Sequence, residues 1–239
     1  LEFRRVLFRS QQTVAIMKKY SIDVELNESE VLIRKQKISP AKFNINGDWS
    51  SASFFICMAA LSNHSDFLMK NISTKSIQGD EVLLNWMTDA GLICSEIENG
   101  IRIQKTKPLK LSSTYSLFST PDLAQPLAVM CAALNHNVTF NGTQNLRLKE
   151  TDRVTALHIE LKKCGVDLSD GENEIVLKGK FHCAEETFET YNDHRMLMSL
   201  AMLSLKCGQA DLKNPGVVKK SFPDFFQQMK NLGFTVLFQ

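Results

Sequence analysis

Three segments of the chain are apolar at almost every position, and each of them follows an aspartate. They run from 50 to 61 after Asp48, from 123 to 134 after Asp122, and from 196 to 205 after Asp193. A helix that is apolar all round is a buried helix, because it has no face suited to water. Segments of 10 to 12 residues are too short to cross a membrane. The pattern therefore predicts three buried core helices.

A second, amphipathic helix is predicted after each core helix. The first turns of these helices hold aspartates 72 residues apart, and each helix ends at a glycine: Asp80 and Gly91, Asp152 and Gly165, Asp224 and Gly233. Glycine just past the last turn is the usual helix stop. A fixed period of this length indicates a repeated supersecondary unit, so the chain is predicted to contain three related units.

Short alternating segments predict strands in each unit. One strand lies between the two helices, and another follows the second helix: 67–69, 138–140 and 210–212, then 166–168 and 234–236. Turn residues at 98–100 and 171–173 return the chain through 101–103 and 175–177, which is a hairpin pattern. Residues 11–34 look like the end of a fourth unit, with the end of a helix followed by a hairpin.

Packing three such units around one axis would bury all three apolar helices together. The predicted fold class is α/β, an inside-out prism with buried parallel helices and sheets outside. A single doubly wound parallel sheet is the alternative, but it does not account for the hairpins. We expect a non-native leader at 1–10, the tail of a preceding domain at 11–46, and a second domain at 47–239.

Composition narrows the classes of function. The 28 basic and 26 acidic residues leave a net charge of +2, which argues against bulk nucleic-acid binding. No apolar run reaches the length of a membrane helix. The five histidines show no metal-ligand spacing. The six cysteines form no C-x-x-C pair and are interpreted as reduced thiols of a cytosolic protein.

A charged loop leads into the second helix of the middle unit. Lys149 and Arg153 are four residues apart and share a face if a helix starts here, with Glu150 between them. The N-terminus of a helix favours anions. When this stretch is taken alone, a solvated first turn with weak ion pairs is the favoured explanation.

Four motifs occur in order along the repeat. They are Gly47-Asp48-Trp49-Ser50-Ser51-Ala52-Ser53, Lys149-Glu150-Thr151-Asp152-Arg153, Tyr191-Asn192-Asp193-His194-Arg195-Met196 and Lys220-Ser221-Phe222-Pro223-Asp224. Together they resemble the 5-enolpyruvylshikimate-3-phosphate synthases, or 3-phosphoshikimate 1-carboxyvinyltransferases, over about residues 11–239. Trp49 departs from the family pattern, in which we expect a small residue.

The resemblance implies the enolpyruvyl transferase-like prism, of which this chain would hold the C-terminal domain. It implies transfer of the enolpyruvyl group of phosphoenolpyruvate to the 5-hydroxyl of shikimate 3-phosphate, with release of phosphate, in the shikimate pathway of aromatic amino-acid biosynthesis. No cofactor or metal is implied, and no nucleic-acid or membrane partner. We expect a cytoplasmic monomer at full length and an inactive fragment when the N-terminal half of the site is missing.

The resemblance also assigns roles to particular residues. Asp122 matches the base that takes the hydroxyl proton, and Glu150 matches the acid that protonates the methylene carbon. Shikimate 3-phosphate is expected to contact Asp122, Lys149 and Asn145. Phosphoenolpyruvate is expected to contact Arg153, Arg195 and Lys220, and His194 is a possible auxiliary residue.

Simpler readings of these residues stay open. Asp122 could be a helix cap, Glu150 a surface glutamate, and each cation a solvated side chain. The chain could also be a non-catalytic, anion-binding half-protein. Two related classes are further alternatives: an enolpyruvyl transferase acting on a UDP-sugar, which uses a reactive cysteine, and an RNA 3′-phosphate cyclase, which needs a nucleotide site.

Overall fold

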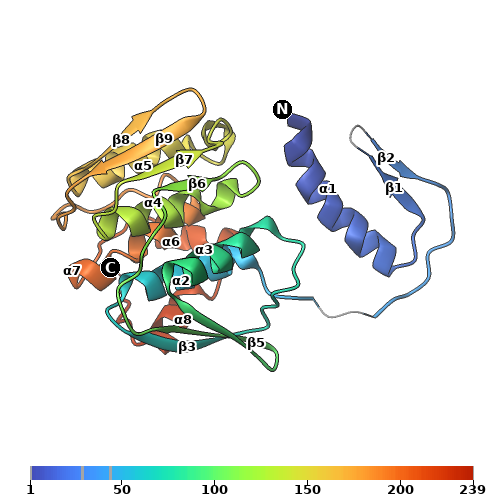
Figure 1. The fold of residues 1–239 in the computed structure, drawn as a ribbon, viewed down its shortest axis with the longest axis horizontal. Helices are drawn as coiled ribbons and strands as arrows, with labels where there is room; N and C mark the ends of the chain where they lie inside the picture. The colour runs from blue at the N-terminus through green and yellow to red at the C-terminus, as the bar shows by residue number, and fades with distance from the viewer. Residues whose placement is uncertain (1, 28–29, 43–44, 239) are drawn as a thin grey trace.

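The computed structural model describes residues 2–27, 30–42 and 45–238; Leu1 of the expected leader lies outside them. The chain begins with α1 (Glu2–Lys19) and an antiparallel hairpin of β1 (Val24–Leu26) and β2 (Val31–Ile33). Residues 34–42 and 45–48 form neither helix nor strand. Figure 1 shows this first part of the chain standing apart from the body that follows. The predicted helix end and hairpin before the first repeat are confirmed.

Three buried helices occupy the centre of the body: α2 (Trp49–Leu61), α4 (Ala124–Ala133) and α6 (His194–Ala201). All ten residues of α4 are buried, and α2 packs against α4 as α4 packs against α6. The short helix η2 (Pro121–Leu123) leads into α4. The prediction of buried core helices is confirmed. The third one ends four residues early, because the chain turns before the separate short helix α7 (Ser204–Cys207).

The second helix of each unit is α3 (Val82–Ala90), α5 (Arg153–Lys163) or α8 (Phe225–Asn231), and α3 is preceded by η1 (Gly79–Glu81). The predicted stop glycines have positive φ values: Gly91 at 108°, Gly165 at 75° and Gly233 at 95°. This left-handed region is easily reached only without a Cβ, so the glycines end the helices as predicted. Two further short helices are η3 (Leu146–Leu148) and η4 (Pro215–Lys220).

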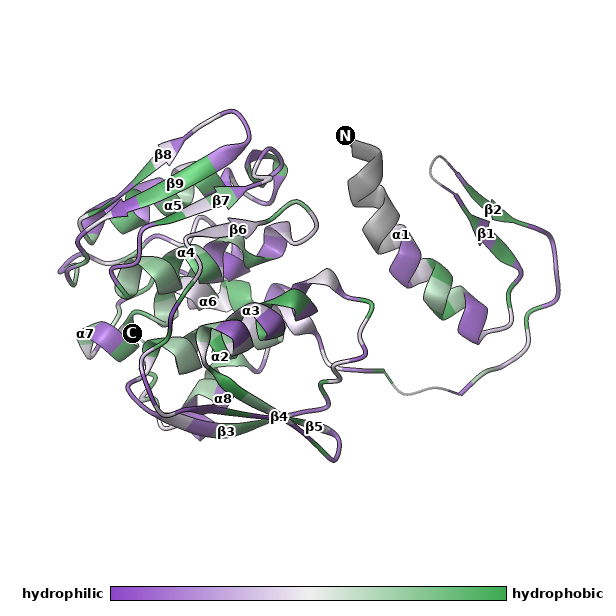
Figure 2. Cartoon of the chain, viewed as in Figure 1, coloured by the Kyte–Doolittle hydropathy of each residue, from purple (hydrophilic) through white to green (hydrophobic). Residues whose placement is uncertain are grey.

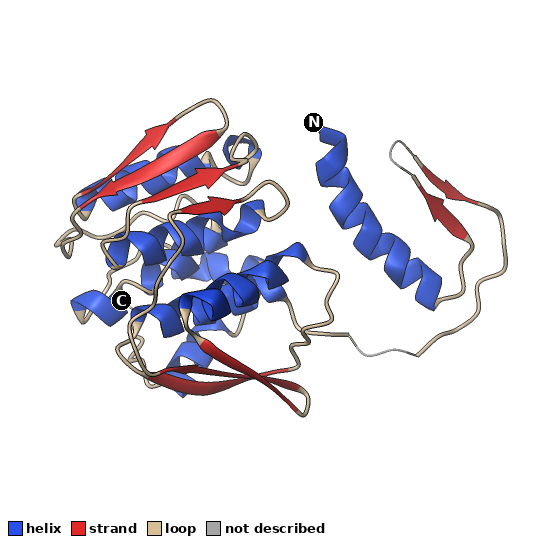
Figure 3. Cartoon of the chain, in the orientation of Figure 1, coloured by secondary structure: helices blue, strands red, loops and turns tan. Residues whose placement is uncertain are grey.

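Two sheets lie on opposite sides of the helices (Figure 3). The first has the order β3-β5-β4 and is antiparallel: β3 (Ser65–Lys70), β5 (Gly100–Lys105) and β4 (Ile93–Ile97). The second has the order β6-β7-β9-β8: β6 (Thr114–Ser116), β7 (Val138–Asn141), β9 (Glu174–Gly179) and β8 (Val166–Asp170). Only its β6–β7 pair is parallel. The hairpins and the helix-inside arrangement match the predicted prism and exclude a doubly wound parallel sheet.

The third unit departs from the prediction. Residues 234–236 form no strand, and residues 210–212 contribute a single bridge, between Phe188 and Leu212. A strand needs a neighbour along which a ladder of hydrogen bonds can run. Within the part of the chain that is described, the third unit has no such neighbour, so its apolar alternation does not produce a sheet.

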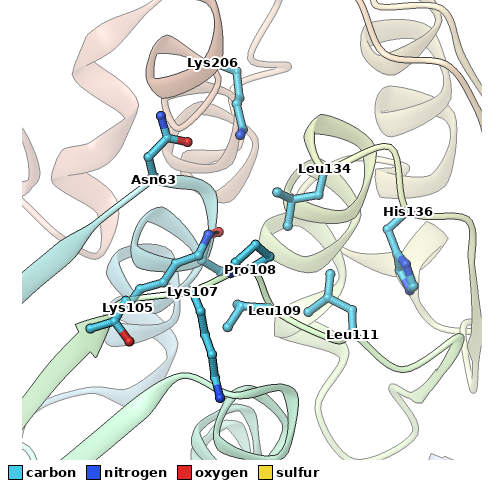
Figure 4. A pocket seen from close by; sticks show the side chains of 11 residues that line it. Asn63, Lys105, Lys107, Pro108, Leu109, Leu111, Leu134, His136 and Lys206 are labelled. Carbon is cyan, nitrogen blue, oxygen red and sulfur yellow. Dashed lines mark hydrogen bonds between the residues drawn. The ribbon is translucent and has the colours of Figure 1, made fainter.

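The central helices point in the same direction. Ala60 near the end of α2, Leu134 just after α4 and Lys206 in α7 line one pocket of about 370 Å³, shown in Figure 4. Lys105 Nζ donates hydrogen bonds there to the carbonyl oxygens of Ala60 at 2.5 Å and Ser62 at 2.7 Å. The last carbonyls of a helix have no partner within the helix, and a cation satisfies them. The C-terminal ends of the helices therefore meet at this pocket, and their N-terminal ends meet on the other side.

The hydropathy of individual residues can be followed along the ribbon. In Figure 2 the turn between β8 and β9 is hydrophilic, and the coloured second half of α1 carries both hydrophilic and hydrophobic bands. No helix among the described residues is long and apolar enough to cross a membrane.

The prediction of six reduced thiols is wrong for one pair. Cys183 and Cys207 form a disulfide with a Cα–Cα distance of 5.5 Å, while Cys57, Cys131 and Cys164 are buried free thiols. Cys183 lies in a loop and Cys207 at the end of α7, 24 residues later. No local spacing marks this pair, because only tertiary packing brings the two residues together.

We expect Leu127→Ala to lower the free energy of unfolding by about 2–5 kcal/mol. Leu127 lies in the middle of α4 with no exposed surface, so its removal leaves a cavity that the packed neighbours cannot fill. Urea denaturation measures the change. Leu237→Ala is the matched control, because 79% of Leu237 is exposed. Equal effects of the two substitutions would contradict the buried-helix account.

Candidate functional site

Asp122 lies where the N-terminal ends of the helices meet, and three cations contact it. Lys149 Nζ is 3.1 Å and Arg153 Nη1 is 3.0 Å from Asp122 Oδ1. Arg195 Nη2 is 3.2 Å from Oδ2. The cations come from the loop before α5, from the first residue of α5 and from the first turn of α6. The fold thus brings four of the predicted site residues into direct contact.

Arg153 extends this cluster to two more carboxylates. Its Nε is 2.9 Å from Asp193 Oδ2, and its Nη2 is 2.8 Å from Glu150 Oε2. Only 1% of the Arg153 side chain and none of the Asp193 side chain is exposed. The planar guanidinium can serve three acceptors at once because its five N–H groups point in fixed directions.

The helix-cap alternative fits two of the three repeat aspartates. Asp48 caps α2 by accepting hydrogen bonds from the backbone of Ser50 and Ser51, and Asp193 caps α6 by accepting one from the Arg195 backbone N–H at 2.8 Å. Asp122 lies inside η2, where Thr120 holds the cap position. Its carboxylate faces the cations, so a capping role alone does not explain this residue.

A second acidic group lies at the start of α2. Asp80 is buried and accepts a hydrogen bond from Ser50 Oγ, while Gln78 Nε2 donates to Asp48 Oδ1 at 2.5 Å. Burial raises the pKa of Asp80 to about 6, with the Ser50 hydroxyl opposing the rise and the charge of Asp122 adding to it. The N-terminal ends of all three central helices therefore belong to one electrostatic environment.

The charges at this end of the helices shift two further pKa values. Burial alone would raise the pKa of Asp122, but Arg195, Lys149 and Arg153 outweigh it and hold that pKa well below its usual range. The pKa of His194 is lowered by burial and by Arg195. Asp193 opposes this shift, because its Oδ1 lies 3.8 Å from His194 Nδ1, and the imidazole sits beside the cluster.

Two predicted site residues lie at the edge of the cluster or outside it. Lys220, at the end of η4, is exposed and donates its Nζ to the carbonyl oxygen of Asn192 at 2.7 Å. Asn145 precedes η3, where its carbonyl oxygen accepts a hydrogen bond from the backbone of Leu148. The structure thus connects Lys220 to the loop before Asp193 and leaves the contact of Asn145 with a ligand as a prediction.

The unexpected Trp49 packs inside the protein. It is fully buried, and its Nε1 donates a hydrogen bond to the carbonyl oxygen of Ser73 at 3.0 Å. Its backbone N–H donates to Gln78 Oε1 at 2.8 Å. The buried indole therefore fixes the start of α2 against the loop that contains Ser73.

Sequence reasoning missed the parts that Asp193 and Gln125 play. Asp193 was identified as the start of a core helix and as part of the 191–196 motif without a role in the site, yet it binds Arg153 and has Gln125 Nε2 at 3.5 Å. The available signal was its equivalence to Asp122 in the repeat. Among the described residues, no group of three or more His, Cys, Asp or Glu is placed to hold a metal ion.

Solved structures first define the class of fold. The chain resembles EPSP synthase from Acinetobacter baumannii with a TM-score of 0.77 and 22% identity, covering 93% of this chain and 54% of that one. It resembles the enolpyruvyl transferase NikO from Streptomyces tendae with a TM-score of 0.65 and 14% identity, covering 93% and 52%. The fold is that of the enolpyruvyl transferases.

Sequence comparison then gives the family. A sequence profile of EPSP synthase (3-phosphoshikimate 1-carboxyvinyltransferase) matches residues 8–229, so the chain belongs to the EPSP synthase family. It is 31% identical to the 3-phosphoshikimate 1-carboxyvinyltransferase of Bacteroides fragilis over 228 residues, and 32% identical to that of Methanocaldococcus jannaschii over 234 residues. Each alignment covers 94% of this chain, but only 56% and 52% of those proteins. The chain thus spans about half the length of the relatives it matches, and the family predicted from the motifs is confirmed.

We expect Arg153→Met to destabilise the protein by about 3–5 kcal/mol, because it leaves the buried carboxylate of Asp193 without its guanidinium partner. Arg147→Met is the matched control. Arg147 pairs with Asp152 and Asp170 in the same region, but 43% of its side chain is exposed, so its loss should cost less than about 1 kcal/mol. Chemical unfolding of the two variants measures the difference. Similar losses of unfolding free energy in both variants would show that burial does not make the Arg153 ion pair more important for stability.

Proposed function

We propose that this chain supplies one half of the active site of a 3-phosphoshikimate 1-carboxyvinyltransferase. In this reaction the 5-hydroxyl of shikimate 3-phosphate bonds to C2 of phosphoenolpyruvate, and phosphate is released. The observation that carries the proposal is the group of Lys149, Arg153 and Arg195 around Asp122, at the meeting point of three helix N-termini. It combines cations for two anionic substrates with a carboxylate for proton transfer.

The cations suit the charges of both substrates. Arg153 and Arg195 can bind carboxylate or phosphate through two parallel hydrogen bonds, which favours phosphoenolpyruvate. Lys220, held against the Asn192 carbonyl, lies on the same side and adds a third cation for this substrate. Lys149 is a point charge suited to the phosphate of shikimate 3-phosphate. We propose that Asn145 contributes a further contact to that substrate.

The two carboxylates are proposed to move the protons. Glu150, with 43% of its side chain exposed, delivers a proton to C3 of phosphoenolpyruvate and later removes one from the resulting methyl group. Asp122 takes the hydroxyl proton as the carbon–oxygen bond forms. Its low pKa makes it a weak base while three cations contact it. Substrate anions that draw Lys149, Arg153 and Arg195 toward themselves raise its proton affinity at the moment the base is needed.

The domain organisation is part of the proposal. We propose that residues 47–239 form the C-terminal domain, that 11–46 end a preceding domain, and that 1–10 are a non-native leader. Exposed apolar side chains on β2 support the assignment of 11–46 to a preceding domain: Val31, Leu32 and Ile33 are 43%, 45% and 49% exposed. A strand with such side chains fits a place in a larger sheet. The proposal includes a cytoplasmic, monomeric enzyme at full length and an inactive fragment in isolation.

We expect Arg195→Ala and Lys220→Ala, made in the full-length enzyme, to weaken the binding of phosphoenolpyruvate more than the binding of shikimate 3-phosphate. Loss of a charge-assisted contact should cost on the order of 1.5–3 kcal/mol of binding free energy. Steady-state kinetics with each substrate varied in turn measures the effect. Lys219→Ala is the control for Lys220, because it removes an exposed cation one residue away. Unchanged phosphoenolpyruvate affinity in both variants would remove Arg195 and Lys220 from the site.

The two carboxylates can be separated in the full-length enzyme. Glu150→Gln should abolish deuterium incorporation into the methylene group of phosphoenolpyruvate, because an amide cannot act as a general acid or base toward carbon. Asp122→Asn should block attack by the hydroxyl, and each change should lower the rate by about 10²–10⁴. Mass spectrometry and phosphate release follow the two steps. Asp152→Asn is the control, since Asp152 caps α5 and asparagine also caps helices. Wild-type turnover in Asp122→Asn, or normal exchange in Glu150→Gln, would overturn the corresponding role.

A further inference from the structure

Asn192 and Asp193 contact all three residues that are proposed to bind phosphoenolpyruvate, Arg153 and Lys220 through their charged groups and Arg195 through its backbone. Arg153 Nε donates to Asp193 Oδ2 at 2.9 Å, and the backbone N–H of Arg195 donates to Asp193 Oδ1 at 2.8 Å. Lys220 Nζ donates to the carbonyl oxygen of Asn192 at 2.7 Å. The cations come from α5, α6 and η4, so this two-residue segment ties three elements together. A shift of this segment would therefore move contacts of all three residues.

The backbone leading into this segment has an unfavourable conformation. Tyr191 has a φ of 53° and Asn192 a φ of 54°, both in the left-handed region. Asparagine tolerates this region, whereas a bulky side chain such as tyrosine rarely adopts it. The backbone N–H of Asp193 closes the turn by donating to the carbonyl oxygen of Thr190 at 2.9 Å. Such a turn persists only where its surroundings hold it in place.

Glu160, on the buried face of α5, holds the turn. It has no exposed surface, and its Oε1 accepts a hydrogen bond from the Tyr191 hydroxyl at 2.7 Å. Its Oε2 accepts one from the backbone N–H of Glu189 at 3.1 Å. Lys163 Nζ balances the charge at 2.7 Å from Oε2 and also donates to the carbonyl oxygen of Thr187 at 3.0 Å. Every donor to this carboxylate therefore belongs either to its own helix or to the segment before Asp193.

The Tyr191 hydroxyl is a permanent donor in this network. Burial, the hydrogen bond to Glu160 and the negative charge of that carboxylate all raise the pKa of the Tyr191 phenol. A buried glutamate is rare unless it is paired, and a carboxylate that accepts several hydrogen bonds fixes the groups that donate them. Glu160 thus fixes the turn to the rigid helix α5 through these hydrogen bonds.

We propose that Glu160 is a positioning residue of the anion site: through Tyr191 and the Glu189 amide it fixes the 191–193 turn and thereby the spacing of Arg153, Arg195 and Lys220. The identity of the anion, phosphoenolpyruvate, rests on the proposed function. The residue touches no substrate in this account. The competing explanation is that Glu160 only stabilises the fold by joining α5 to the following loop.

Kinetics of the full-length enzyme separates the two explanations. Glu160→Gln keeps the shape but removes the charge, and Tyr191→Phe removes a single hydroxyl. We expect both to raise the KM for phosphoenolpyruvate by about tenfold while the KM for shikimate 3-phosphate changes much less, because a hydrogen bond to a charged group is lost. Glu160→Ala should have a larger effect than Glu160→Gln, which retains an acceptor for the hydroxyl.

Leu161→Ala is the control for general destabilisation of α5. Leu161 is the next residue, is fully buried and is apolar, so its loss weakens the helix without removing a hydrogen bond to the turn. It should lower the melting temperature with no preferential effect on phosphoenolpyruvate. If Glu160→Gln and Tyr191→Phe also lower the melting temperature without changing the ratio of the two KM values, the positioning role is overturned. If Glu160→Gln does not fold, Tyr191→Phe alone decides.

Amide hydrogen exchange without ligands tests the inference independently of the reaction. Faster exchange at 189–193 in Glu160→Gln and Tyr191→Phe, but not in Leu161→Ala, supports the positioning role even if the wild-type enzyme shows no turnover of phosphoenolpyruvate. Such an absence of turnover would reject the proposed function but not the positioning role. Unchanged exchange at 189–193 in both Glu160→Gln and Tyr191→Phe would overturn the positioning role whatever the enzyme catalyses.

Discussion

Arg153 places a guanidinium with almost no exposed surface among the carboxylates of Asp122, Glu150 and Asp193, which come from three elements of the fold. Three carboxylates this close together would repel one another, and burial would penalise their charges further. The guanidinium relieves both costs, because it offers hydrogen bonds and a delocalised charge in one rigid group. Removal of either the guanidinium or one of its buried carboxylate partners would leave an unpaired charge and destabilise the protein. Arg153 therefore links the starts of α5 and α6 to the short helix that leads into α4.

The two ends of the central helices show complementary electrostatics. At their N-terminal ends lie Asp48, Asp122 and Asp193, the partners that the positive end of a helix dipole favours. At the other end Lys105 donates to the last carbonyls of α2. The acids at the N-terminal ends then recruit the cations of the site. An anion entering this site meets side chains that already have partners, and it must offer them stronger contacts than the protein does.

The sequence predicted the helices well because their signals are local. All-round apolarity marked α2 and α4 as buried, and the glycines at 91, 165 and 233 ended the second helices at the expected places. Strand prediction was less successful in the third unit, because a strand exists only with a partner. The disulfide between Cys183 and Cys207 had no local signal either. Both outcomes depend on which segments lie side by side in space.

The motifs in the sequence were sufficient to predict the family, and the resemblance then singled out Asp122, Lys149, Arg153 and Arg195. Taken by itself, the sequence around Asp122 favoured a helix cap, a role that could coexist with catalysis. Only the tertiary structure decided this, because three cations from separate elements surround its carboxylate while Thr120 holds the cap position. The same holds for Asp193 and Glu160, whose burial and partners arise from segments distant in the chain. Residue type and spacing determine which chemistry is available, and packing determines which groups share it.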